Sequence, residues 1–155
     1  MDNTISQHER FLAGSIHLST FTKYIIPFGN FIFPLLLWVC NKEKLSFVDA
    51  NGKRAINFQI SILIYSIVLG TIAIPVALMT GWEFISFTNL WHNGHDLDLN
   101  FSHLPSLGTN AIILGIIAVL GIVLILIDIL CTIIATLRAN EGQLYKYPFT
   151  IPFLK

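Results

Sequence analysis

Hydrophobic residues in this chain come in long blocks, and the longest block covers residues 111–137. Its first part, residues 111–127, contains nothing more polar than glycine, and the charge-free run begins upstream at Leu99. A helix over 111–137 would extend about 40 Å, which is enough to cross a hydrocarbon core of about 30 Å with some tilt. Because lipid offers backbone groups no hydrogen-bond partner, this block predicts a transmembrane helix.

Two further apolar regions precede this block. Residues 55–80 carry no charge and would extend about 39 Å as a helix, so they predict a second transmembrane helix. Residues 9–41 are also apolar, but prolines and a glycine interrupt them at 27–34. We therefore expect two short helices, 9–26 and 31–41, that form a hairpin, with a single kinked span as the alternative.

Basic residues are distributed unevenly among the polar segments. The segment at 42–54, which we expect to be a loop because Asn51-Gly52 is a turn signal, and the tail at 138–155 are both rich in lysine and arginine, whereas 81–107 contains neither. The positive-inside rule therefore places the first two segments in the cytoplasm and 81–107 outside.

These patterns predict an all-α fold, a polytopic helical bundle with four membrane segments in a single membrane domain over residues 1–155. The composition agrees, because 54% of the residues are hydrophobic and only 12% are charged. We expect a multi-pass protein of the cell (inner) membrane with both termini in the cytoplasm. The tail is expected to lie along the cytoplasmic interface, with Lys23 reaching the membrane interface near the bend of the hairpin.

One charged residue, Asp128, stands inside the longest block. A carboxylate in a bilayer costs a few kcal/mol, so it normally faces a neighbouring helix or a wet cavity. Small or polar residues share its helical face: Gly121, Thr132, Ala135 and Ala139. We expect a neutral or paired carboxylate that tightens helix packing, with His17 as its partner at a similar depth. A proton or ion relay and a contact to a partner subunit are the alternatives.

The block at 55–80 has a matching face. Its small and polar residues fall on one stripe: Gln59, Ser66, Gly70, Ala73 and Ala77. Small residues let helix backbones approach, so this stripe is expected to pack against the face from Gly121 to Asp128. Asn57 and Gln59 are expected to be buried amides that join helices rather than bind a ligand.

The segment at 81–107 holds the only cluster with metal-ligand chemistry: His92, His95, Asp96, Asp98 and His103. Three imidazoles and a carboxylate could hold zinc, but their spacing matches no recognised site. We therefore expect a solvated loop with no metal and no other cofactor. Cys40 and Cys131 lie in apolar segments and are expected to serve as small hydrophobes without a disulfide. The formal net charge of zero argues against a nucleic-acid partner.

Four stretches in order, HLSTF, IPFGNFIFPLLLW, FVDANGKRAINFQIS and ANEGQLYKYPFTIPF, resemble a large prokaryotic membrane family of unknown function. That family is itself considered similar to a component of protein import at the chloroplast inner envelope, the twenty-kilodalton Tic protein. The resemblance covers nearly the whole chain and implies a four-helix membrane bundle with both ends on one side. It implies no catalytic or binding residues.

Three functions are compatible with these features. We expect a non-enzymatic accessory or assembly subunit of a membrane complex, with protein translocation or insertion as its process. Its partners would be the lipid bilayer and other membrane subunits or further copies of the chain. A small transporter or channel that uses the intramembrane Asp128 is the alternative. A membrane enzyme is disfavoured because no nucleophile and base stand at matched depth.

Overall fold

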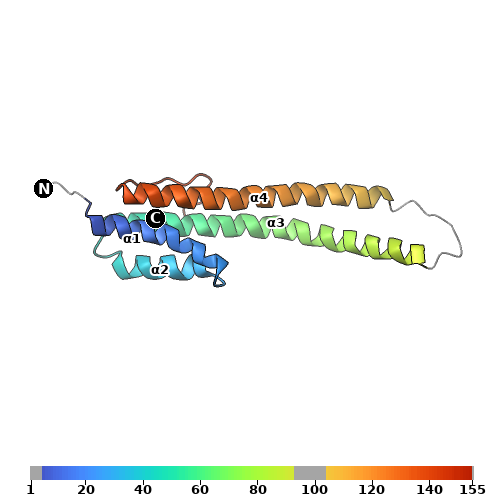
Figure 1. The fold of residues 1–155 in the computed structure, drawn as a ribbon, viewed down its shortest axis with the longest axis horizontal. Coiled ribbons are helices and arrows are strands. Elements are labelled where there is room, and N and C mark those ends of the chain that lie inside the picture. Colours follow the sequence, from blue (N-terminus) through green and yellow to red (C-terminus); the bar gives the residue numbers. More distant parts are fainter. Residues whose placement is uncertain (1–4, 93–103, 155) are drawn as a thin grey trace. The chain divides into compact units, whose positions relative to one another are not determined.

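The computed structural model describes residues 5–92 and 104–154, which form four α-helices and one 3-10 helix (Figure 1). These are α1 (Gln7–Ser19), η1 (Thr20–Tyr24), α2 (Gly29–Asn41), α3 (Ser46–His92) and α4 (Leu104–Asn140). No strand occurs in the described residues, so the all-α prediction is confirmed for them.

The chain divides into two compact units. Unit 1 comprises Met1–Ile64 and Ile125–Lys155, and unit 2 comprises Tyr65–Leu124. Unit 1 contains α1, η1, α2, the first part of α3, the last part of α4 and the tail, so it holds the hairpin that was expected at 9–41. Unit 2 contains only segments of α3 and α4.

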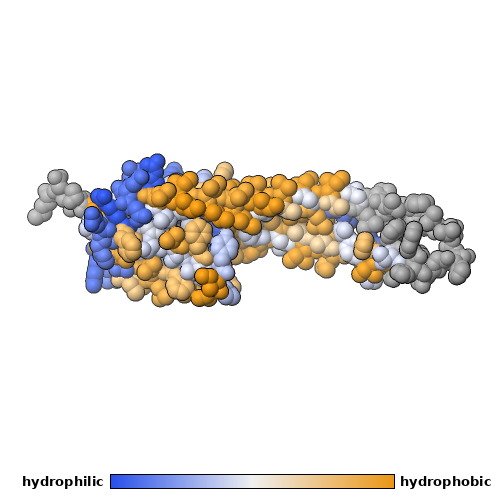
Figure 2. Space-filling view, in the orientation of Figure 1, coloured by the Kyte–Doolittle hydropathy of each residue, from blue (hydrophilic) through white to orange (hydrophobic). Residues whose placement is uncertain are grey.

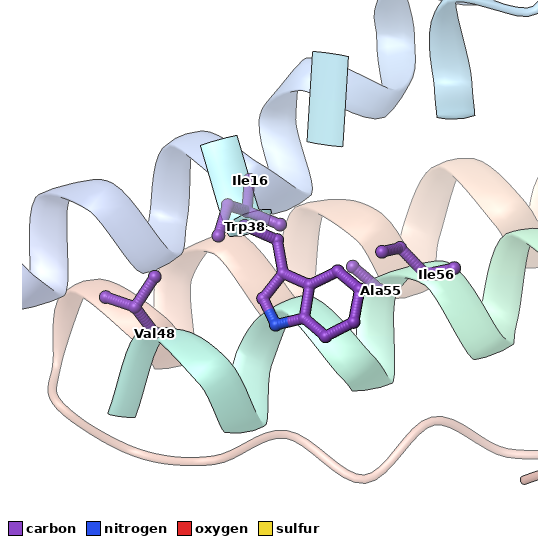
Figure 3. Packing of buried hydrophobic residues seen from close by; sticks show 5 residues of the cluster. All are labelled: Ile16, Trp38, Val48, Ala55 and Ile56. Atoms are coloured by element: carbon purple, nitrogen blue, oxygen red, sulfur yellow. The ribbon is translucent and has the colours of Figure 1, made fainter. Parts of the chain in front are cut away.

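Trp38 occupies the centre of the largest hydrophobic cluster of unit 1. Its indole lies among Ile16 of α1 and Val48, Ala55 and Ile56 of α3 (Figure 3). The indole nitrogen also donates a hydrogen bond of 2.8 Å to Asp49 Oδ1. Trp38 therefore packs α2 against both α1 and α3.

The expectation of a loop at 42–54 is wrong beyond residue 45, because α3 begins at Ser46 and continues through Asn51-Gly52. Tertiary packing outweighs the turn preference of this pair. Asn51 is fully buried, and its amide nitrogen donates to Phe47 O at 2.9 Å within the helix. Gly52 lies against Trp38, where a Cβ atom would be 2.5 Å from the indole Cγ. The glycine is thus needed for close approach and not for a turn.

The predicted loop at 81–107 is likewise shorter than expected. Helix α3 extends to His92 and α4 begins at Leu104, so only 93–103 separates the two helices. The residues that extend α3 include large apolar side chains such as Trp82, Phe84 and Ile85, and these are compatible with a helix surrounded by lipid.

Helix α4 ends at Asn140, three residues beyond the predicted membrane block. Gly142 has φ of 79°, its backbone nitrogen donates to Ala139 O, and the nitrogen of Gln143 donates to Arg138 O. This pair of hydrogen bonds around a left-handed glycine is a Schellman motif. The motif reverses the chain, so the residues after it pack against α3 within unit 1.

Among the residues of unit 2 whose exposure is described, none is buried. Its most enclosed positions recur every three or four residues along one face of each helix: Leu69, Ala73, Val76 and Thr80 on α3, and Leu114, Ile117, Gly121 and Leu124 on α4. Large apolar side chains cover the other faces, and hydrophobic colour dominates the described surface of α4 (Figure 2). Such a surface suits acyl chains rather than water.

Two helices of the described part are long and apolar enough to cross a membrane, over Ser46–Ser86 and Gly108–Asn140. The expectation of four membrane segments is supported only for these two. Helices α1 and α2 contain 13 residues each and would extend about 20 Å, which is less than a hydrocarbon core of about 30 Å.

Candidate functional site

Unit 1 buries a set of polar side chains, which we call the buried polar cluster. Its members are His17, Thr20, Asn51, Asn57, Gln59, Ser61, Asp128 and Thr132. A polar group taken from water is costly unless it finds hydrogen-bond partners, so the partners of these side chains define what the cluster does.

Asp128 forms the centre of the first half of the cluster. Its side chain is almost fully buried, and Oδ2 forms an ion pair with Lys23 Nζ of η1. The other oxygen, Oδ1, accepts a hydrogen bond of 3.0 Å from Gln59 Nε2 of α3. Gln59 Oε1 in turn accepts from Asn30 Nδ2 of α2 at 2.9 Å. Four side chains from four elements therefore satisfy one another inside the protein.

This arrangement corrects two sequence-based expectations. His17 is not the partner of Asp128, and Lys23 does not extend to the membrane interface. A buried carboxylate is stabilised most by a full opposite charge, and Lys23 is the only lysine or arginine between Arg10 and Lys42. The expectation of a paired Asp128 that tightens packing agrees with these contacts.

His17 forms the second half of the cluster, together with Asn51 and Tyr147. Asn51 uses its amide nitrogen on Phe47 O, so its oxygen is left to accept from His17 Nε2, 3.0 Å away. His17 Nδ1 then accepts a hydrogen bond of 2.9 Å from the Tyr147 hydroxyl. Burial raises the pKa of Tyr147 well above its usual range, so the hydroxyl keeps the proton that it donates. The geometry therefore fits a neutral His17 with its proton on Nε2.

Tyr147 belongs to the tail, and its ring secures the tail against α3. The ring stacks on Phe58 with centroids 4.2 Å apart and an interplanar angle of 18°. Tyr145 contacts Tyr147 edge to face at 5.0 Å. The tail thus packs into unit 1 through aromatic side chains. Its place along the cytoplasmic interface stays a prediction.

Side chains of α3 also bind the tail backbone. Asn57 pairs with both backbone groups of Leu154, at 2.8 and 2.9 Å, and Ser61 Oγ accepts from Ile151 N at 2.9 Å. Arg54 Nη1 donates to Tyr145 O at 3.0 Å. Because an extended segment lacks internal partners, these side chains supply the hydrogen bonds that its backbone needs in apolar surroundings.

The remaining expected packing residues fall into two groups. Gln59 contacts Asp128 as predicted, and Thr132, Ala135 and Ala139 are buried on the same face of α4. Gly70 and Gly121 are half-buried, but a Cβ atom at either position would meet nothing within 4 Å. Ser66 is exposed. The stripe of small residues is therefore closely packed only in its part within unit 1.

Most of the proposed metal ligands lie outside the described residues: His95, Asp96, Asp98 and His103. His92 is the last residue of α3. Within 5–92 and 104–154, no group of three or more His, Cys, Asp or Glu side chains could hold a metal ion. Cys40 and Cys131 are both free, as expected.

Sequence reasoning missed Lys23, Asn51 and Tyr147 as members of the cluster. A signal existed for Lys23, since it is a lone cation in an apolar segment of a chain that also buries a lone carboxylate. No comparable signal marked Asn51 or Tyr147, because their roles depend on how the tail returns to the bundle.

The fold and the cluster define a class of protein: an all-helical membrane protein whose buried polar side chains join its helices and its tail. Within this class the chain belongs to the magnetosome magnetite crystal formation protein family, whose sequence pattern matches residues 8–154. No curated protein and no solved structure matches the chain.

The family match corrects the resemblance drawn from the four sequence stretches. The chain does not belong to a family of unknown function related to the Tic import component, and nothing supports a link to that component. The four stretches lie within the matched residues, so the similarity concerned a real family pattern that was assigned to the wrong family. The expectation of a membrane protein stands.

Proposed function

We propose that this chain is a non-enzymatic, membrane-embedded accessory protein in the formation of magnetite crystals. The observation that carries the proposal is the family match, because it spans residues 8–154 and includes the membrane helices, the hairpin and the tail. A shared whole-chain pattern supports a shared role more strongly than a match to one segment would. The family match does not support a role in protein translocation or insertion.

The contacts of the buried polar cluster support an accessory role. Both oxygens of Asp128 are engaged, by Lys23 and Gln59, and His17 is held on both ring nitrogens. Side chains that are satisfied within the protein stabilise one arrangement of helices. A transporter that uses Asp128 as a relay would need this carboxylate to exchange a proton or ion, and its contacts do not favour that alternative.

The connection between α3 and α4 is the part that we propose to face the mineral. Its sequence carries carboxylates and imidazoles but no lysine or arginine, and the positive-inside rule places it opposite the cytoplasm. Carboxylate and imidazole groups bind iron ions, which are the substrate of magnetite formation. Crystals that grow in a membrane compartment would meet this side of the protein.

The experiment is deletion of the gene in magnetite-forming cells, followed by electron microscopy of crystal number, diameter and shape. We expect fewer or smaller crystals, with recovery when the wild-type gene is restored. Unchanged crystals in the deletion strain would contradict the proposal.

A second complementation strain would test the connection itself. It would carry His92, His95, Asp96, Asp98 and His103 replaced by asparagine or glutamine, with Lys146→Ala, an exposed tail position, as the matched control. Recovery by the control alone, with equal protein in the membrane, would support contact of the connection with iron or mineral. If both variants restore the crystals, we would assign the role in crystal formation to the membrane part of the chain and not to the connection.

A further inference from the structure

We propose that the hairpin formed by α1, η1 and α2 inserts into one leaflet of the bilayer without crossing it, and thereby favours membranes that curve toward that leaflet. The partner of the hairpin is the acyl-chain layer of that leaflet. The proposal concerns the membrane contact of unit 1 and does not depend on a role in magnetite formation.

The hairpin is too short to cross the hydrocarbon core. Helix α2 contains 13 residues and would extend about 20 Å, compared with about 30 Å for the hydrocarbon core. Since α1 continues through η1, α2 is the shorter arm and limits the depth that the turn can reach. Neither helix is among the two candidate membrane spans of the described residues. A hairpin of this length reaches slightly past the bilayer midplane, about 15 Å deep, but falls short of the opposite interface.

The outer surface of the hairpin is apolar and exposed. At the turn, Ile25 is 84% exposed and Phe28 is 69% exposed. Further exposed apolar side chains follow along both arms: Phe11, Leu18, Ile32, Leu35, Leu36 and Val39. The surface over α2 is largely hydrophobic in Figure 2. Exposed apolar area of this extent marks contact with a membrane or another protein.

The polar groups of the turn point inward. Lys23 is paired with Asp128, and the Asn30 amide is bonded to Gln59. The hairpin therefore presents no lysine or arginine at its tip, although its sequence contains one there. If the tip lay in water, its only cation could stay solvated at the surface. In hydrocarbon, the cation is stable only when it is paired inside the protein.

The backbone of the turn is also suited to hydrocarbon. The nitrogens of Ile25 and Ile26 both donate to Thr22 O, and that of Gly29 donates to Ile26 O. Pro27 has no backbone donor to satisfy. Irregular backbone at membrane depth is tolerated where its polar groups find partners within the protein, and these three nitrogens meet that condition.

Lipid is a better occupant of this surface than a second copy. Basic residues stand at both ends of the hairpin, with Arg10 in the first turn of α1 and Lys42 directly after α2, so the hairpin enters and leaves on one side of the membrane. The exposed side chains lie on both arms and on the turn, as expected for a hairpin surrounded by acyl chains. Two helices of about 10 Å diameter then add most of their cross-section to one leaflet.

The depth of the tip is tested with the full-length chain in vesicles of phosphatidylcholine and phosphatidylglycerol. Cys40 and Cys131 are replaced by alanine, and a nitroxide label is attached to Ile25→Cys or Phe28→Cys. We expect high accessibility to oxygen, low accessibility to a water-soluble nickel chelate, and no reaction with impermeant thiol reagents from either side. The matched control Glu43→Cys, in the exposed segment after α2, should show the opposite pattern.

Three results would overturn the proposal. Reaction of the tip from the side opposite Glu43→Cys would mean that the hairpin crosses the bilayer. Reaction from the same side would mean that it lies in water. Strong dipolar broadening between labels on different molecules would mean that a second copy covers the surface.

Curvature is tested by comparing small with large vesicles. An exposed tail position, Lys146→Cys, reports orientation through an impermeant reagent. We expect the fraction of molecules labelled from outside to rise severalfold in small vesicles, where the outer leaflet is the convex one. The rise should disappear in Phe28→Glu and persist in Leu144→Glu, an exposed residue outside the hairpin. Equal labelling at all vesicle sizes would contradict the curvature preference.

Discussion

At the scale of residues, Asp128 and Lys23 depend on each other. Asp128 is nearly inaccessible, and the Lys23 side chain is about one-fifth exposed, so neither charge is well solvated without its partner. Removal of one member of a buried pair leaves the other charge uncompensated, whereas removal of both does not. The pair is therefore best examined by a double-mutant cycle.

We expect Lys23→Met and Asp128→Asn each to lower the free energy of unfolding by about 3 kcal/mol. The double variant should lose less than the sum of the two, because no unpaired charge remains. Thermal unfolding in a mild detergent would measure all three variants. Additive losses would indicate that the two side chains do not act as a pair.

Tyr147 joins the tail to His17 by one hydroxyl group. Tyr147→Phe keeps the stack on Phe58 but leaves His17 Nδ1 without its donor, so it should cost about 1–2 kcal/mol. Lys146→Ala, at the exposed neighbouring position, should change stability by less than about 0.5 kcal/mol. Limited proteolysis of the tail would give a second measurement, and equal cleavage of both variants would argue against anchoring by the hydroxyl.

At the scale of elements, Gly52 determines how closely α2 approaches α3. Gly52→Ala places a methyl group against Trp38, whose indole is also held by Asp49, so we expect a loss of about 1–3 kcal/mol. Gly81→Ala is the matched control, since its Cβ atom would meet nothing within 4 Å. There the better helix propensity of alanine should stabilise by about 0.5–1 kcal/mol. Similar melting temperatures for both variants would contradict close packing at Gly52.

The long helices could be predicted from the sequence, because an uncharged block of this length has few stable conformations in lipid. Their ends could not. Asn51-Gly52 favours a turn locally, yet the close contact with Trp38 and the bond to His17 keep it helical. Contacts between segments distant in sequence decided these boundaries.

The candidate site shows the same division. The inward face of Asp128 and its contact with Gln59 could be predicted from helical periodicity. The lone charge of Lys23 was a signal for its pairing with Asp128, but the choice of Lys23 over His17 also depends on where the 3-10 turn of η1 directs the side chain. The role of Tyr147 depends on the Schellman motif that directs the tail back along α3.

At the scale of the whole molecule, the distribution of lysine and arginine predicts which segments share a side of the membrane. The tail and the segment between α2 and α3 carry basic residues, whereas 81–107 carries none. Since segments rich in lysine and arginine that flank membrane helices are retained preferentially in the cytoplasm, the two basic segments should lie on the same side and the start of α4 on the other.

Single cysteines at Lys44, Lys146 and Gly108 test this topology in intact cells, with Cys40 and Cys131 replaced by alanine. An impermeant maleimide should label Gly108→Cys in vesicles or cells that expose the non-cytoplasmic face, and should reach Lys44→Cys and Lys146→Cys only after the membrane is opened. Labelling of Lys44→Cys and Lys146→Cys from opposite sides would require an odd number of crossings between them. That result would exclude the paired crossing of the membrane by α3 and α4.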